Sequence, residues 1–146
     1  MRYGAYKMRN VAGTLSIRTR GSGLLEITDA VREWLRGQDV TVGLLTLFCR
    51  HTSASLLVQE NAAGAVRRDL EKFFVALAPE DPNRYEHDDE GADDMPAHLR
   101  TALTGVSLSI PVADGNLTLG TWQGIYLFEH RHRAHERNIA LHLLGE

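Results

Sequence analysis

The chain has 146 residues, of which 43% are hydrophobic and 24% are charged, and its formal net charge is -3. These values predict one globular domain spanning residues 1–146, and they argue against general disorder and against broad nucleic-acid binding. We expect a cytoplasmic protein, because no apolar run approaches the ~18–20 residues that span a bilayer, the N-terminal MRYGAYKMRN lacks a secretory apolar segment, and the single Cys49 excludes an intramolecular disulfide.

The N-terminal quarter predicts a strand, a turn and a helix. Residues 14–18 alternate polar and apolar side chains, as a half-buried strand does. The glycines of residues 21–23 indicate a turn. Thr28 or Asp29 can then cap a helix, which Gly37 ends.

The strongest strand signal is residues 40–48, VTVGLLTLF. This run is short, β-branched and almost continuously apolar, so we expect a central strand that is covered on both faces. Residues 56–58 can form a second short strand, and Asn61 can cap the helix that follows. The predicted apolar stripe of that helix comprises Val66, Leu70, Phe73, Phe74 and Leu77.

A long polar region runs from Pro79 to Met95 and is typical of a functional or disordered loop. Pro96 can open a short helix that Gly105 closes. The C-terminal part is rich in strand signals, and it includes a hairpin turn at Asp114-Gly115 and strands over 106–112, 117–119, 125–128 and 139–144. The chain therefore predicts an α+β fold, with a mostly antiparallel β-sheet and two or three packed helices.

Three segments carry candidate chemistry, and the first is residues 50–55, RHTSAS, directly after the strongest strand. His51 can act as a metal ligand or as a general base near neutral pH. Ser53 and Ser55 offer hydroxyls suited to a phosphate. A strand end followed by a serine-rich turn fits the same residues equally well.

The second segment is residues 87–98, HDDEGADDMPAH, which places two histidines and five carboxylates where little can be buried. If Pro96 begins the helix, Asp93 and Asp94 lie just before it and His98 lies in its first turn. Carboxylates favour magnesium, and an added imidazole shifts the preference toward zinc or manganese. A solvated acidic loop is the alternative; we favour it for residues 88–90, and we favour a site for His98.

The third segment is residues 129–137, EHRHRAHER. On a strand, His130 and His132 share one face, as a pair of metal ligands can. The other face carries Arg131 and Arg133, which suit a phosphate better than a cation. A mixed, solvated strand end is the interpretation that these residues favour.

Several of these segments together resemble the YjbQ family, also called UPF0047. The matching stretches are GLLTLFCRHTSASLLVQENA, YEHDDEGADDMPAHLRTALTGVSLSIPV, LGTWQGIYLFEHR and RNIALHLLGE, which cover residues 43–146 fairly continuously. The resemblance implies a compact α+β domain that assembles into homotrimers with sites near subunit boundaries. It also implies a weak or secondary thiamine-phosphate synthase activity, which joins a pyrimidine diphosphate to a thiazole phosphate and releases pyrophosphate.

That chemistry calls for a divalent metal, magnesium or zinc, and for a small phosphorylated metabolite as the partner, with no nucleic acid and no membrane. The family motifs imply a catalytic set of His51, His98 and Glu129. The implied metal ligands are His51, His87, His98, Asp93 and Asp94. The implied substrate- or phosphate-binding residues are Ser53, Ser55, Gln123 and Arg131. Two alternatives stay open: a metal-dependent hydrolase or lyase acting on another phosphorylated metabolite, and a non-catalytic trimer that binds a small molecule.

Overall fold

The computed structural model describes residues 7–146. Residues 1–6, which hold part of the stretch where no secretory signal was found, lie outside the described residues. None of the helices in the described range has the length and apolar character needed to cross a membrane.

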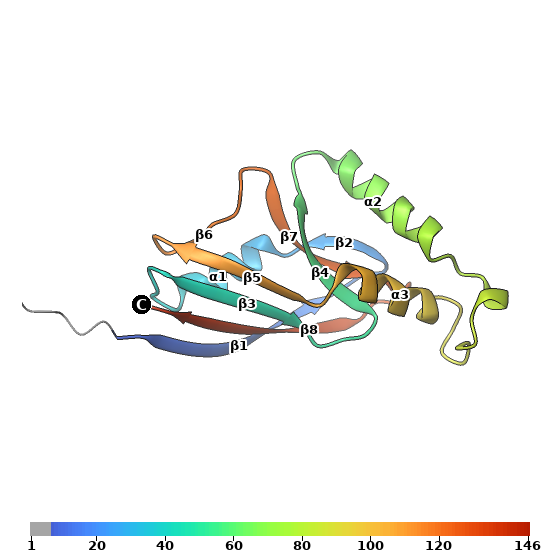
Figure 1. The fold of residues 1–146 in the computed structure, drawn as a ribbon, viewed down its shortest axis with the longest axis horizontal. Coiled ribbons are helices and arrows are strands. Elements are labelled where there is room, and N and C mark those ends of the chain that lie inside the picture. The colour runs from blue at the N-terminus through green and yellow to red at the C-terminus, as the bar shows by residue number, and fades with distance from the viewer. Residues whose placement is uncertain (1–6) are drawn as a thin grey trace, which may run out of the picture.

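The described strands divide between two antiparallel sheets (Figure 1). In spatial order, the larger sheet contains β1 (Arg9–Arg18), β8 (Glu136–Gly145), β3 (Gly43–Cys49), β5 (Ser107–Ala113) and β6 (Asn116–Leu117). The smaller sheet contains β2 (Gly23–Glu26), β7 (Gln123–Glu129) and β4 (Ala54–Glu60). The helical elements are α1 (Thr28–Arg36), α2 (Gly64–Leu77), α3 (Asp94–Thr104) and the 3-10 turn η1 (Pro82–Arg84). The predicted α+β class is confirmed, with two sheets in place of one.

The smaller sheet is the middle layer, and β7 is the strand that is covered on both faces. Ile125 and Leu127 point into the main core, which also contains the buried side chains of α1 and the larger sheet. Tyr126 and Phe128 point to the other side, where they pack against the apolar side chains of α2. Figure 1 shows α2 lying across this second side. The near-complete burial of β7 follows from these two cores.

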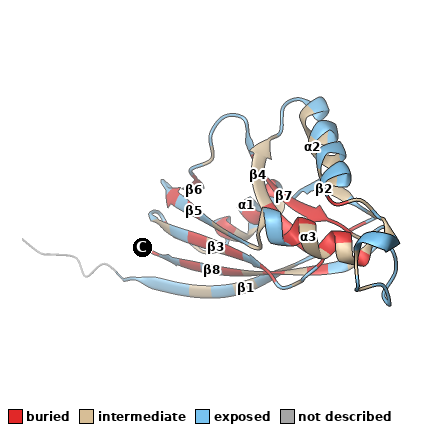
Figure 2. Cartoon of the chain, turned by 45° about the vertical axis from the view of Figure 1, so that its right-hand side comes forward, coloured by how far each residue is buried: buried red, intermediate tan, exposed pale blue. Residues whose placement is uncertain are grey.

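The prediction that the strand over residues 40–48 is covered on both faces is wrong. The strand β3 begins at Gly43 and is central in its sheet, but its side chains alternate. Leu45 and Leu47 are fully buried, whereas Leu44 is 44% exposed and Phe48 is 47% exposed. The described part of the chain covers only the inner face of this sheet (Figure 2). A continuous apolar run is therefore compatible with a strand that is buried on both faces and with a strand whose outer face is apolar but exposed.

The helix ends differ from the predicted caps. Gly37 ends α1 as expected, but Ile27 is the N-cap and no side chain caps the helix. The Thr28 hydroxyl instead donates to Glu26 Oε2 (2.7 Å) and accepts the backbone N–H of Ile125 (2.9 Å). Thr28 therefore joins the helix to both neighbouring strands of the smaller sheet.

Asn61 does not cap α2 either, because its side-chain amide donates to Glu26 and the helix starts at Gly64. Of the predicted stripe, Leu70 and Phe74 pack against the sheet. Phe73 and Leu77 are 59% and 50% exposed. The apolar stripe of α2 is therefore narrower than its sequence suggests.

The start of α3 matters most for function. Gly105 ends this helix as predicted, with a positive φ of 93°. The helix begins at Asp94, two residues before Pro96, so Asp94 lies inside the first turn. Residues four apart share a helix face, and Asp94 therefore lies beside His98 instead of preceding it in a loop.

Candidate functional site

Four side chains converge at the start of α3. One ligand-type atom from each of His87, Glu90, Asp94 and His98 lies within 4.8 Å of the others. His87 and Glu90 come from the loop before the helix, and the other two come from the helix itself. These four residues are called the Asp94 cluster below.

Asp94 is the centre of the cluster and is only 2% exposed. Its Oδ2 lies 2.7 Å from Nε2 of His87 and 3.0 Å from Nε2 of His98. Its Oδ1 accepts a hydrogen bond from the Arg131 guanidinium (2.5 Å). Burial opposes ionisation of Asp94, but the His87 hydrogen bond and the charges of His98 and Arg131 outweigh it, so its pKa is lowered. Asp94 is therefore a buried carboxylate ion.

The imidazoles of this cluster face acceptors on both sides. Nδ1 of His98 lies 2.8 Å from the carbonyl oxygen of Thr52, so Nδ1 carries a proton and donates a hydrogen bond to that oxygen. Its Nε2 then faces the Asp94 carboxylate. His87 lies in the same way between Asp94 and the Asp89 carboxylate, which is 3.1 Å from Nδ1. Each ring therefore needs either a second proton on Nε2 or a cation between Nε2 and Asp94.

The donor set fits a divalent metal. Two imidazole nitrogens and two carboxylate oxygens converge, and both atom types bind Zn²⁺ and Mn²⁺. The hydrogen bond to Asp94 raises the pKa of His87, with Asp89 and Glu90 adding to it although desolvation opposes it. A group of negative charge that attracts a proton also attracts a cation.

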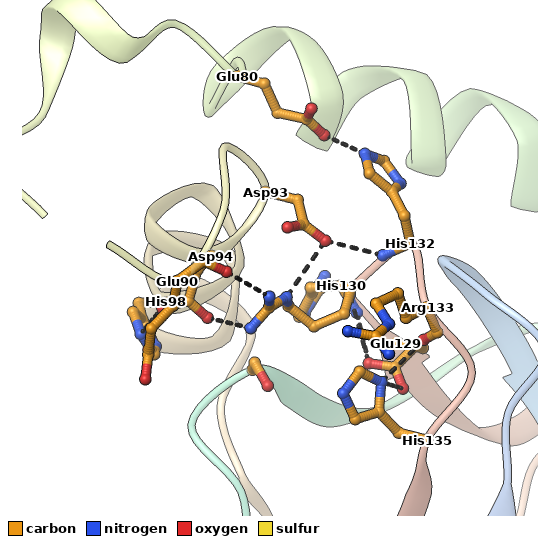
Figure 3. A network of polar contacts seen from close by, with 12 residues as sticks. Glu80, Glu90, Asp93, Asp94, His98, Glu129, His130, His132, Arg133 and His135 are labelled. Carbon is orange, nitrogen blue, oxygen red and sulfur yellow. Dashed lines mark hydrogen bonds and ion pairs between the residues drawn. The ribbon is translucent and has the colours of Figure 1, made fainter. Parts of the chain in front are cut away.

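Two residues predicted to touch ligands instead hold this loop in place. Asp93 Oδ2 accepts from Nε of Arg131 (3.2 Å) and from the backbone N–H of His132 (2.9 Å). Arg131 also donates to the carbonyl oxygen of Glu90 (2.8 Å). Figure 3 shows Asp93 near Asp94, with a dashed line from Asp93 to His132. Asp93 is not part of the Asp94 cluster. The guanidinium of Arg131 makes its hydrogen bonds to Glu90, Asp93 and Asp94.

His51 lies outside the Asp94 cluster but in an adjoining cavity. The cavity has a volume of about 680 Å³, and its lining includes His51, His98, Arg50 and Phe48. Nε2 of His51 accepts the backbone N–H of Asn138 (2.8 Å), so its proton is on Nδ1. Burial, followed by the charge of Arg137, lowers the pKa of His51. His51 is therefore a neutral hydrogen-bond donor in this state.

Glu129 and Ser53 belong to a separate, closed polar centre. Glu129 is 1% exposed, and its Oε1 accepts from Thr19 (2.7 Å) and from Nε of Arg137 (2.9 Å). Arg137 also donates to the Ser53 hydroxyl (3.0 Å). Burial opposes ionisation of Glu129, but its hydrogen bonds with Arg137 and Thr19 lower its pKa. These residues satisfy one another, and Figure 3 shows Glu129 apart from the Asp94 cluster.

Ser55 and His130 form a second buried pair. Ser55 is completely buried, and its hydroxyl lies 2.9 Å from Nε2 of His130. Burial, with the charges of Arg100 and Arg137, lowers the pKa of His130 to about 3. His130 and His132 do not share a strand face, because β7 ends at Glu129. The favoured interpretation, a solvated strand end, holds for His132, which is exposed and pairs with Glu80, but not for His130, which is buried.

Gln123 lies far from these groups. It begins β7, whose other end is Glu129, about 20 Å away along an extended strand. Its Oε1 accepts the backbone N–H of Gly120 (2.8 Å), which shapes a turn. Sequence reasoning also missed Glu90, which it assigned to a solvated loop. The signal available was its spacing of three residues after His87, but only the folded loop turns both toward Asp94.

Comparisons with known proteins point to the same family over most of the chain. A family model described as "UPF0047 protein YjbQ-like" matches residues 13–146. The chain is 50% identical to a UPF0047 protein of Synechocystis over 132 residues, 90% of each chain. It is 50% identical to the UPF0047 protein YjbQ of Salmonella typhimurium over 134 residues, 91% of this chain and 95% of that one. A crystal structure of a YbjQ-like protein of unknown function from Sulfolobus solfataricus matches with a TM-score of 0.87 at 24% identity, covering 96% of this chain and 100% of that one.

Proposed function

The chain belongs to the family of YjbQ-like UPF0047 proteins, and on that premise we propose that it is a divalent-metal-dependent enzyme acting on a small phosphorylated metabolite. The observation that supports this most is the Asp94 cluster. A carboxylate that is 2% exposed faces two imidazole nitrogens, and each imidazole has a second acceptor behind it. One divalent cation would resolve both conflicts at once, since neutral imidazoles and carboxylates are its natural ligands.

The reaction we propose is the secondary thiamine-phosphate synthase reaction. The carbon–oxygen bond between the pyrimidine and its diphosphate breaks, the thiazole nitrogen forms the new carbon–nitrogen bond, and pyrophosphate leaves with the electron pair. A cation held by the four residues would neutralise the charge that develops on the departing diphosphate. The adjoining cavity of about 680 Å³ has the volume of a small-molecule site.

The apolar residues of this cavity can bind the ring of a substrate, and its polar residues can bind the phosphate. Phe48 and Val106 give an apolar wall against which a heteroaromatic ring can pack. The Arg50 guanidinium and the Nδ1–H of His51 can donate to phosphate oxygens. His98 lines the cavity and also belongs to the Asp94 cluster, so a phosphate in the cavity would approach the proposed cation there. In this proposal His51 acts as a donor to substrate.

The test is pyrophosphate release from the two phosphorylated halves by protein stripped of metal and then given Mg²⁺, Mn²⁺ or Zn²⁺. We expect activity only with added metal, and a loss of at least about 100-fold in Asp94→Asn and His98→Ala. Asp29→Asn is the matched control, because the Asp29 side chain is fully exposed on α1. Equal rates in all four proteins, or in the absence of protein, would refute the proposal.

Hydrolysis of another phosphorylated metabolite is a second candidate, because solvent reaches the cluster. The His87 side chain is 37% exposed and the Glu90 side chain is 63% exposed. Water can therefore compete with an organic acceptor. Release of inorganic phosphate from phosphorylated metabolites without the thiazole substrate, with the same dependence on Asp94, would favour hydrolysis. Metal binding without turnover of any substrate would favour the non-catalytic binding trimer.

We also propose that the chain assembles into a homotrimer through the outer face of the larger sheet. Leu44 and Leu144 are paired across β3 and β8, each 44% exposed, and Phe48 lies on the same face. Exposed apolar groups in one patch are typical of subunit contacts. Phe48 also lines the cavity, so a neighbouring copy on this face would close the site. Light scattering should give three chains for the wild type and a smaller species for Leu144→Asp.

A further inference from the structure

A second cavity, of about 410 Å³, lies between α2, α3 and the ends of β2 and β7. It does not share a lining residue with the cavity of His51 and His98. The charged residues of its lining are Arg68, Lys72 and Arg100, together with Glu71 and Glu129. Phe74, Val75 and Phe128 provide its apolar walls.

Arg100 is the informative residue of this cavity, because it is only 4% exposed and lacks an anion. Its guanidinium donates to the carbonyl oxygen of Ala78 (2.7 Å). Its Nε–H has no hydrogen-bond partner within residues 7–146, and Arg100 forms no salt bridge there. A buried guanidinium without a carboxylate is unfavourable unless something else supplies the negative charge.

Neither carboxylate of the cavity wall forms a salt bridge with Arg100. Oε1 of Glu71 accepts the backbone N–H of Leu24 (2.8 Å), and Glu129 is paired with Arg137. Within the described chain, Arg68 and Lys72 also make no salt bridge. The cavity therefore has a surplus of positive charge beside two aromatic rings, Phe74 and Phe128, whose centroids lie 5.5 Å apart.

We propose that this cavity is a second ligand site, which binds an oxyanion, phosphate or carboxylate, attached to an apolar body. The anion would contact the Arg100 guanidinium and be held by the side chains of Arg68 and Lys72 at the cavity edge. The apolar body would lie against Phe74 and Phe128. This inference does not depend on the proposed catalytic function, because it uses none of the residues of the Asp94 cluster.

The experiment is a calorimetric titration of the intact protein with phenyl phosphate, phenylacetate, inorganic phosphate and benzyl alcohol. We expect saturable binding of one phenyl phosphate or phenylacetate per chain in this cavity, and much weaker binding of inorganic phosphate and of the neutral alcohol. Preference between the two aromatic anions identifies the oxyanion. Equal binding of benzyl alcohol, or no saturable binding of either anion, would overturn the proposal.

Variants locate the binding. Arg68→Ala combined with Lys72→Ala should weaken binding by about tenfold or more, and both positions are exposed, so folding should be retained. Arg100→Met should abolish binding if circular dichroism shows that it folds. Arg50→Ala, in the other cavity, should leave this binding intact. Loss of binding in Arg50→Ala together with full binding in the Arg68 and Lys72 variant would assign the ligand to the other cavity and refute the proposal.

Discussion

Asp94 and Glu129 are both buried carboxylates, 2% and 1% exposed, and each is hydrogen-bonded to a guanidinium. They differ in whether the hydrogen-bond donors and acceptors around them are matched. Thr19, Arg137 and the backbone N–H groups around Glu129 all donate to it, so that centre is complete. The imidazoles around Asp94 have acceptors on both sides, so that cluster is complete only with extra positive charge. Burial of a charge alone does not distinguish structure from function, whereas the balance of donors and acceptors does.

The largest expected effect is a loss of stability when the buried pair of Glu129 and Arg137 is broken. Arg137→Met leaves Glu129 buried without its charge partner, and we expect the free energy of unfolding to fall by about 3–5 kcal/mol. Urea denaturation measures this loss. Arg32→Met, at an exposed i,i+3 pair, should change stability by less than about 0.5 kcal/mol. Similar losses in both variants would contradict the contrast drawn between buried and exposed pairs.

The next effect concerns the stability that metal binding adds, which should depend on Asp94 but not on Glu129. At a concentration of cation about 100 times its dissociation constant, binding to the native protein should add about 2.7 kcal/mol of stability. We expect Asp94→Asn to lose this increment, which denaturation with and without Zn²⁺ or Mn²⁺ would measure. Glu129→Gln should be less stable overall yet should keep the increment. An increment that survives in Asp94→Asn would place the cation elsewhere.

A smaller effect concerns pH and His130, whose native pKa is lowered to about 3. The unfolded chain takes up a proton on this histidine near pH 6.5, whereas the folded chain does not. Stability is therefore fully present above about pH 6.5 and falls toward pH 3, by at most about 1.4 kcal/mol per pH unit. His130→Gln should flatten the profile of unfolding free energy between pH 6.5 and 5. An unchanged slope would mean that other groups carry it.

The smallest effect is expected at Gln123, at the end of β7 opposite Glu129. Gln123→Ala removes one exposed hydrogen bond to Gly120, so stability should change by less than about 1 kcal/mol. Metal binding and pyrophosphate release should match the wild type. A large loss of activity here would mean that the functional region reaches along the whole strand.

The fold class could be predicted because local patterns carry it. Alternation, the Asp114-Gly115 turn and the glycine stop at Gly105 each match the structure, and both turn residues of the hairpin have positive φ values, 51° and 73°. Which apolar strand is covered twice could not be predicted, because β3 and β7 have similar composition and only the packing of α2 distinguishes them.

Part of the candidate site was also accessible from sequence. His87, Asp94 and His98 were selected, and they converge. Glu90 was not selected, because acidic loop residues look alike until the loop is folded. Arg137 was not selected, although it neutralises Glu129, because its partner lies in another strand and belongs to the other sheet. The two residues are only eight positions apart, but they lie in strands of different sheets, so no strand or helix spacing indicates that they pair.

The position of β8 has a consequence for the order in which this protein assembles. It follows every other described element along the chain, yet it lies between β1 and β3. Until β8 is made, β1 has no neighbour in its sheet, and the backbone N–H of Asn138 is not there to fix His51. Contacts between such distant segments form slowly, over about milliseconds to seconds. We expect the cavity of His51 to take shape in the last and slowest step of folding, together with the closing of the sheet.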